Sequence, residues 1–205
     1  MFGKPGFSAA DVDVLEAREF HKGFFRTLGY QLRHRLFGGG WGKPISRELF
    51  YKPQAVGVLM YDPDSDRVAL VEQFRIGALD HPRSPWLLEV VAGLVEEGES
   101  FEEVAHRELQ EEAGLSAERL IPIADVILSP GGCNERIVLY CGLGKLEGDG
   151  GIFGLPEEGE DIRLHIVSRA QAMAALAAGE CDNAPLTIAL QWLALHYEAI
   201  VEGEI

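Results

Sequence analysis

Three glutamates, Glu108, Glu111 and Glu112, fall within five positions of the segment RELQEEAGL. On a helix, residues three and four positions apart are neighbours, so these carboxylates would share one face and repel one another. A bound Mg²⁺ ion, which prefers oxygen ligands, would cancel that repulsion. Arg107 lies one turn after Glu103 and can also reach Glu111, so it can orient one carboxylate. Taken alone, RELQEE is nevertheless more typical of an ordinary solvated helix with Glu/Arg pairs.

The flanking residues predict that this segment is helical over residues 101–113. Ser100 and Glu103 have the spacing of a capping box, which starts a helix at Ser100. Gly114 stands where the end of a helix favours a residue that tolerates a left-handed conformation. The apolar stripe that would bury this helix consists of Phe101, Val104, Ala105, Leu109 and Ala113.

The other elements place this helix inside a mixed fold. Two predicted helices close the chain, and the second has Asn183 as its cap and Pro185 in its first turn. The order of elements predicts an α+β fold with a mixed β-sheet sandwiched between helices. Strands are predicted for AVGVLMY, RVALVEQF, WLLEVVAGLV (residues 86–95), IPIADVILS, RIVLYCGLG and DIRLHIVS.

Charge separates an N-terminal arm, residues 1–52, from the body, residues 53–205. The arm, expected to be an irregular β structure, carries nine Lys/Arg and five Asp/Glu, a net charge of +4. The body carries nine Lys/Arg and twenty-eight Asp/Glu, a net charge of −19. The arm could be merely solvated, or could dock on the body, on a second copy or on an anionic ligand.

The composition also excludes several classes of protein. The chain has 205 residues, 47% of them hydrophobic, which fits one folded domain with an appendage. The net charge of −15 disfavours nucleic acid as a partner. No apolar run is long enough to cross a membrane, and three cysteines without a C-x-x-C pair predict neither a disulfide framework nor a zinc site. A cytoplasmic location is therefore expected.

A longer pattern surrounds the glutamates and changes the interpretation. Gly93 is followed after five residues by Glu99, and after seven more by the segment Arg107–Leu115. This pattern resembles the Nudix box of the Nudix hydrolase family at every specified position. The resemblance implies the Nudix fold, an α/β/α arrangement in which a loop–helix–loop binds divalent metal. It also implies hydrolysis of a nucleoside diphosphate linked to another group.

The resemblance assigns roles to the residues of the box. Glu108, Glu112 and the carbonyl of Ala92 would be metal ligands for Mg²⁺, with Mn²⁺ as a substitute. Glu111 would support metal binding directly or through water, and is placed in the catalytic set. Arg107 is placed there too, although it is expected to hold the loop–helix geometry rather than touch substrate. Gly93 would allow close backbone approach, and Glu99 would share the role of Arg107.

Other segments are similar to the bacterial ADP-ribose pyrophosphatases within this family. Pro130 lies fifteen residues after Leu115 in LSPGGCNER, and EQFRIG, GEDIRLHIVSR and DNAPLTIALQWL extend the likeness. The resemblance implies Mg²⁺-dependent hydrolysis of ADP-ribose to AMP and ribose 5-phosphate by attack of water at phosphorus. It leaves open which phosphorus is attacked. It also implies a homodimer, because the arm of that group crosses to the second subunit.

The same resemblance suggests a general base and a set of substrate contacts. In the acidic loop LPEEGED, Glu158 is the predicted base, with Glu157 and Glu160 as reserves. Arm packing is an equally good interpretation of Phe24, and a strand-end ion pair is an alternative for Arg75. Cys133 is assigned no role. The predicted substrate contacts are Phe24, Arg47, Glu48, Arg75 and Glu135.

Two alternatives to ADP-ribose hydrolysis remain. The first is hydrolysis of another nucleoside diphosphate derivative, such as GDP-mannose or another nucleotide sugar, or a dinucleotide. The second is a Nudix-fold binding module without turnover. Such a module would be expected to have lost carboxylates of the box, whereas Glu108, Glu111 and Glu112 are all present.

Overall fold

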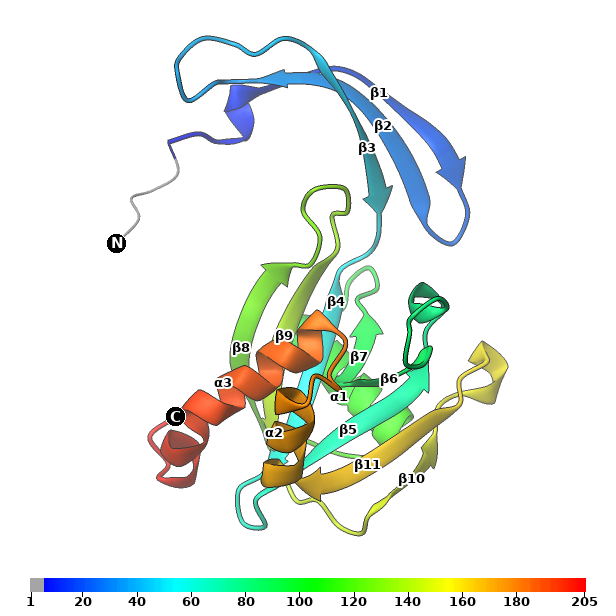
Figure 1. The fold of residues 1–205 in the computed structure, drawn as a ribbon, viewed down its shortest axis with the longest axis vertical. Helices are drawn as coiled ribbons and strands as arrows, with labels where there is room; N and C mark the ends of the chain where they lie inside the picture. The colour runs from blue at the N-terminus through cyan, green and yellow to red at the C-terminus, as the bar shows by residue number, and fades with distance from the viewer. Residues whose placement is uncertain (1–5) are drawn as a thin grey trace. The chain divides into compact units, whose positions relative to one another are not determined.

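The computed structural model describes residues 6–205, except for the side chain of Glu158. The chain forms two compact units, which are described separately here and can be followed in Figure 1. The first contains the N-terminal segment to Lys52 together with Ile127–Glu135. The second contains Pro53–Val126 and Arg136–Ile205.

The first unit is a three-stranded antiparallel sheet in the order β1-β2-β3. This sheet is more regular than the irregular arm expected from the sequence, although two register shifts interrupt the pairing of β1 with β2. The loop 127–135 joins it because the Phe50 amide donates to the Gly132 carbonyl at 2.8 Å. The elements are the 3₁₀ turn η1 (Ala9–Asp11), β1 (Val12–Lys22), β2 (Arg26–His34) and β3 (Ile45–Tyr51).

The second unit is built on a mixed sheet with the strand order β10-β11-β5-β4-β9-β8. Strands β4 and β9 pair in parallel, while β6 pairs with β5 and β7 pairs with β4, both antiparallel. The strands are β4 (Ala55–Asp62), β5 (Arg67–Phe74), β6 (Trp86–Glu89), β7 (Val91–Leu94), β8 (Arg119–Ile127), β9 (Arg136–Leu143), β10 (Gly150–Phe153) and β11 (Ile162–Ser168).

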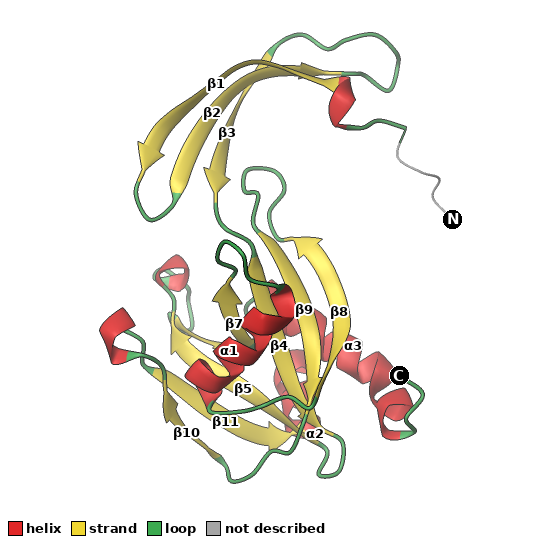
Figure 2. Ribbon diagram, turned by 180° about the vertical axis from the view of Figure 1, so that it is seen from behind, coloured by secondary structure: helices red, strands yellow, loops and turns green. Residues whose placement is uncertain are grey.

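Helices cover both faces of this sheet. Figure 1 shows α2 (Arg169–Ala177) and α3 (Ala184–Val201) across one face. Seen from behind in Figure 2, α1 (Phe101–Ala113) lies across the opposite face. Side chains of α1 such as Val104 and Leu109 are buried against apolar residues of β4, β5 and β11. This layering confirms the α+β fold with a mixed sheet between helices. None of the helices described here has both the length and the apolarity needed to cross a membrane.

Local sequence signals set both ends of α1. The Ser100 side chain accepts a hydrogen bond from the Glu103 amide, and the Glu103 carboxylate accepts one from the Ser100 amide at 2.8 Å. At the other end, Gly114 adopts a left-handed conformation with φ of 62°. The predicted span of 101–113 is therefore confirmed. The cap at Asn183 is confirmed as well, since its side chain accepts from the Leu186 amide at 3.0 Å.

The segment 86–95 differs from the single strand that was predicted. It forms two short strands, β6 and β7, which pair with different neighbours on either side of Val90. Strands β4 and β5 pair directly only over Met60–Asp62 with Arg67–Ala69, so β6 and β7 occupy the space where these two strands diverge. Strand β10, in the glycine-rich segment GGIF, was not predicted, because glycine has a low strand propensity.

Candidate active site

The three glutamates of α1 share a site but are buried to different depths. Glu112 is 3% exposed, whereas the side chains of Glu108 and Glu111 are 13% and 33% exposed. Burial of a carboxylate is unfavourable unless hydrogen bonds or opposite charges compensate it. The partners of each carboxylate therefore show how this helix accommodates the cluster.

Arg107 is the positive charge that offsets the cluster. Its Nη1 lies 2.6 Å from Glu108 Oε1 and 3.2 Å from Glu111 Oε2. Its Nε donates to Glu99 Oε1 at 3.2 Å, and its Nη2 donates to the Leu94 carbonyl at 3.4 Å. The guanidinium thus connects α1 to the preceding loop, and the roles of Arg107 and Glu99 in the site stay predictions. Burial lowers the pKa of Arg107, but the neighbouring carboxylates outweigh this effect and raise it overall.

Glu108 packs directly against the backbone of β7. A Cβ atom added at Gly93 would overlap the Glu108 carboxylate, so only glycine at this position leaves room for the side chain. The close approach expected at Gly93 is therefore an approach of the Glu108 carboxylate to the strand. Burial raises the pKa of Glu108, and the Arg107 charge opposes this shift.

Glu112 is held by donors from two strands. The Ala92 amide of β7 donates to Glu112 Oε2 at 3.0 Å, and Gln73 Nε2 of β5 lies 3.4 Å from Glu112 Oε1. Burial and the Glu108 charge raise the pKa of Glu112 to about 8. The contact to Gln73 was not predicted from the sequence, because an amide next to Glu72 at the polar end of β5 does not indicate its partner on α1.

The donor set of the cluster is suited to a hard divalent cation. Glu108 and Glu112 are carboxylates held in a partly desolvated site, and the absence of a side chain at Gly93 lets Glu108 lie against β7. Within residues 6–205 as described, no group of three or more His, Cys, Asp or Glu side chains has the geometry of a ready-made metal site. Ala92, Glu108, Glu111 and Glu112 are nevertheless brought together at α1 and β7, and their roles as metal ligands stay predictions.

The acidic loop after β10 begins next to α1. The Gly154 amide donates to the Glu111 carbonyl at 3.3 Å, and the Leu155 amide donates to Glu160 Oε2 at 3.1 Å. The Glu160 charge also contributes to the raised pKa of Glu108, after burial and the neighbouring charges of α1. Glu158 belongs to the turn η3 (Pro156–Glu158), but its side chain lies outside the described part of the chain.

Arg75 follows β5 and forms an ion pair in this structure. Its Nε lies 2.7 Å from Glu89 Oε2, as in the alternative interpretation of this residue. Burial raises the pKa of Glu89, and the Arg75 charge opposes that shift. The Arg75 charge also opposes the rise in the pKa of Glu112, which burial causes.

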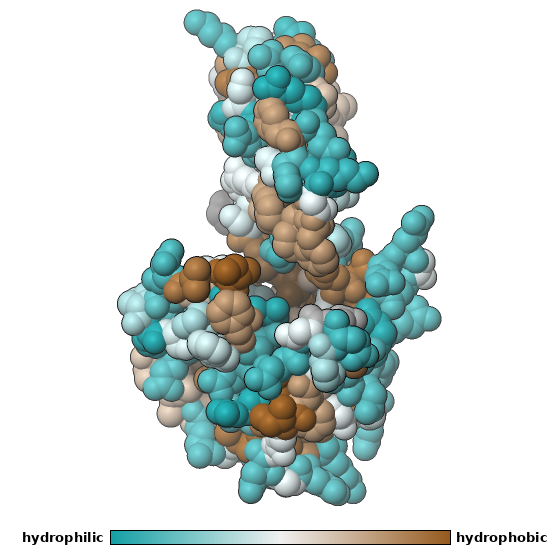
Figure 3. Space-filling model, turned by 90° about the vertical axis from the view of Figure 1, so that its right-hand side faces the viewer, coloured by the Kyte–Doolittle hydropathy of each residue, from teal (hydrophilic) through white to brown (hydrophobic). Residues whose placement is uncertain are grey.

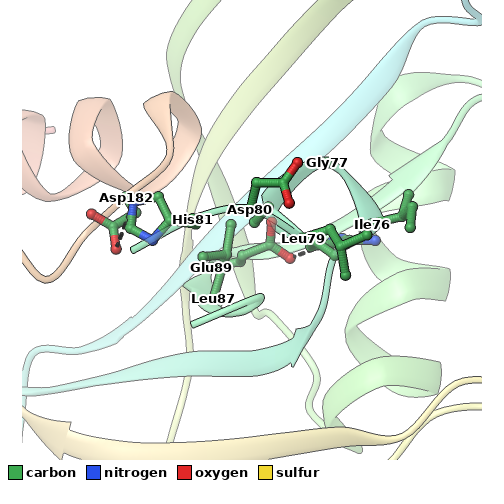
Figure 4. Close-up of a pocket in the computed structure, with 10 residues that line it drawn as sticks. Ile76, Gly77, Leu79, Asp80, His81, Leu87, Glu89 and Asp182 are labelled. Carbon is green, nitrogen blue, oxygen red and sulfur yellow. Dashed lines mark hydrogen bonds and ion pairs between the residues drawn. The ribbon is translucent and has the colours of Figure 1, made fainter. Parts of the chain in front are cut away.

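Arg75 and Glu89 line a pocket of about 390 Å³. Its wall includes the turn η2 (Ile76–Ala78) and Leu79, and Asp182 lies beside His81 at the far end in Figure 4. The pocket combines an apolar wall with a few charged groups, which is typical of small-ligand sites.

The remaining predicted substrate contacts lie in the first unit. Phe24 is 84% exposed and packs edge-on against Phe25, which is the arm packing considered as its alternative. Arg47 and Glu48 are exposed and adjacent on β3. Glu135 forms an ion pair with Lys52. Their roles in substrate binding stay predictions.

Comparisons with known proteins identify the family and the relatives that this chain resembles. A family model described as NUDIX domain matches residues 51–187. An ADP-ribose pyrophosphatase of Haemophilus influenzae is 47% identical over 96% of this chain and 92% of its own length. An ADP-ribose pyrophosphatase of Escherichia coli K12 is 46% identical over 95% and 93%, respectively.

The fold also has a counterpart among solved structures. A crystal structure titled as an ADP compounds hydrolase has a TM-score of 0.61 and 21% identity, and the match covers 92% of this chain and 97% of that one. The matched domain contains the glutamates of α1, the glycine that makes room for Glu108 and the arginine that pairs with Glu108 and Glu111. This chain therefore belongs to the Nudix hydrolase family.

Proposed function

We propose that this chain is an Mg²⁺-dependent pyrophosphatase that hydrolyses ADP-ribose to AMP and ribose 5-phosphate. The observation that carries the proposal is the pair of carboxylates on α1, partly buried Glu108 and buried Glu112. It occurs in a chain that is 46–47% identical, over nearly its full length, to two proteins named ADP-ribose pyrophosphatase. A cation site of this type is suited to the charge of a diphosphate.

In this proposal the carboxylates of Glu108 and Glu112 and the carbonyl of Ala92 hold Mg²⁺, supported by Glu111, and Mn²⁺ can substitute. When bound, the metal neutralises phosphate charge and makes water a better nucleophile. Arg107 acts by position: it holds Glu108 and Glu111 on α1 and ties them to Glu99 in the loop. The charged side chains of the site are thus held in position before substrate binds.

Glu158 is the proposed general base that takes a proton from the attacking water. The loop that carries it starts at Gly154, whose amide is bonded to α1 at Glu111, so a closing loop could bring a carboxylate towards the cluster. Glu160 is a weaker candidate because its carboxylate already accepts from the Leu155 amide. Glu157 is the other reserve, and it is exposed.

The proposed substrate contacts combine an aromatic ring with charged groups. Phe24 would stack on adenine, and Arg47 and Arg75 would meet phosphate oxygens. Glu48 and Glu135 would accept hydrogen bonds from the sugars. Because Arg75 is paired with Glu89 and Glu135 with Lys52, substrate binding would require these ion pairs to rearrange.

We also propose that the protein is a homodimer in which the arm of each copy serves the other. Among the described residues 6–52, Gly29 is the only one that is buried, so the arm has almost no core of its own. The second unit in turn exposes several large apolar side chains, and Figure 3 shows hydrophobic groups exposed among hydrophilic ones. Phe74 packs edge-on against Trp86, and both are exposed, as are Ile76 and Leu79.

The substrate assignment predicts a specific set of products. Purified protein incubated with ADP-ribose should give AMP and ribose 5-phosphate, identified by chromatography, only when Mg²⁺ is present. GDP-mannose should be hydrolysed far more slowly under the same conditions. A preference for GDP-mannose would overturn the substrate, while a lack of hydrolysis of any nucleoside diphosphate derivative would favour a binding module.

Replacement of Gly93 by alanine is expected to lower kcat/KM by roughly tenfold or more, as for other changes that displace a metal ligand. The added Cβ would overlap the Glu108 carboxylate and push it out of position. The matched control is Gly38→Ala, where a Cβ would meet no atom within 4 Å and the backbone needs no positive φ. Equal kcat/KM in the two variants would argue against Glu108 as a ligand.

The variant Glu158→Gln is expected to reduce kcat by roughly a hundredfold or more, the usual contribution of a general base. The affinity for ADP-ribose, measured by calorimetry, should remain similar because the amide keeps the size of the side chain. Glu157→Gln and Glu160→Gln provide matched comparisons in the same loop. If one of them loses turnover while Glu158→Gln does not, the base is that other residue.

The dimer proposal predicts the mass of two chains by light scattering at assay concentration. The specific activity should fall when the protein is diluted below the dissociation constant of the dimer, because each site needs the arm of the other copy. A monomer with full activity would contradict the proposed shared site.

A further inference from the structure

Gln73 is a buried amide that the mechanism above does not use. It lies next to last in β5 and is 6% exposed. Side chains two positions apart on a strand share one face of the sheet. Ala69 and Val71 of β5 pack in the core beneath α1, so Gln73 is the next side chain in this row. A polar group therefore ends an apolar row directly beneath the carboxylate helix.

The partner of Gln73 is one of the proposed metal ligands. Gln73 Nε2 lies 3.4 Å from Glu112 Oε1, while the Ala92 amide donates to Glu112 Oε2 at 3.0 Å. The two oxygens of one buried carboxylate thus have separate donors, which come from β5 and β7. Donors to both oxygens restrict the orientation of the carboxylate plane more than a donor to one oxygen alone.

We propose that Gln73 is a positioning residue that orients Glu112 for cation binding. This inference rests on the proposed role of Glu112 as a metal ligand. An amide suits the task because its NH₂ group donates without carrying charge. A lysine or arginine at this point would compete with a cation, a carboxylate would add a further buried negative charge, and an aliphatic residue would leave Glu112 Oε1 without this donor.

A metal ligand that is oriented by an outer hydrogen bond binds the metal more tightly than one that is free to rotate, typically by roughly 10–100-fold. The competing interpretation is that Gln73 only satisfies a polar pair in the core. A purely structural role would lower the thermal stability of the protein, but would leave the cation affinity of the folded protein unchanged. Cation affinity therefore separates the two interpretations.

The test measures Mn²⁺ affinity without substrate, by electron paramagnetic resonance titration of the whole 205-residue chain. Gln73→Leu is expected to weaken Mn²⁺ binding by roughly tenfold. The concentration of Mg²⁺ that gives half-maximal activity should rise by a similar factor, while kcat at saturating Mg²⁺ should change little. The matched control is Gln191→Leu, the same substitution at an exposed position of α3, where wild-type affinity is expected.

Two further variants make each result decisive. Gln73→Asn keeps an amide but shortens the side chain by one methylene, so it should also weaken Mn²⁺ binding even if Gln73→Leu fails to fold. Glu112→Gln tests the underlying metal site. If Glu112→Gln loses Mn²⁺ binding while every Gln73 variant that folds keeps wild-type affinity, the proposed role of Gln73 is overturned and the metal site is not. Wild-type affinity in Glu112→Gln would overturn the metal site and this inference together.

Discussion

The site depends on the burial of like charges on one helix. Glu108 and Glu112 are one turn apart on α1, and both are largely removed from water, which makes each harder to ionise. Arg107 forms an ion pair with Glu108, and Glu112 accepts hydrogen bonds from donors on β5 and β7. The apolar face of α1 keeps the helix against the sheet and so supplies the energy that keeps these carboxylates in place. The site is therefore a product of the whole packed layer rather than of the box alone.

The divergence of two central strands makes room for β7, which contacts Glu112. Strands β4 and β5 pair over a short stretch and then diverge, and β6 and β7 occupy the space between them. Ala92 of β7 and Gln73 of β5 contact different oxygens of Glu112, so the carboxylate is held by strands from two parts of the sheet. Strand β7 is placed for its contact by pairing with β4, while β6 pairs with β5.

The parts that the sequence predicted well are those with local causes. The ends of α1 follow from the capping box at Ser100 and from Gly114, because each signal acts within one turn of helix. The split of residues 86–95 was missed because it depends on which strands lie alongside, and this is settled only by tertiary structure. Gln73 was missed for a similar reason, since an amide at the end of a strand has no local pattern that marks its partner on α1. The box itself was recognisable because its residue types and spacing are fixed by one compact loop–helix unit.

The ion pairs around the proposed substrate contacts bear on selectivity. Arg75 is held by Glu89, whose pKa burial raises, and Glu135 is held by Lys52. A ligand that draws Arg75 away must offer a charge at least as favourable as that of a carboxylate, and a diphosphate does so. A neutral sugar or nucleoside offers no such exchange, so Arg75 would stay paired with Glu89. Drawing Arg75 away leaves Glu89 buried without its cation, which is costly, and only a strongly anionic ligand compensates for that cost. The proposed function therefore predicts discrimination that begins with charge, before the adenine or the second ribose is recognised.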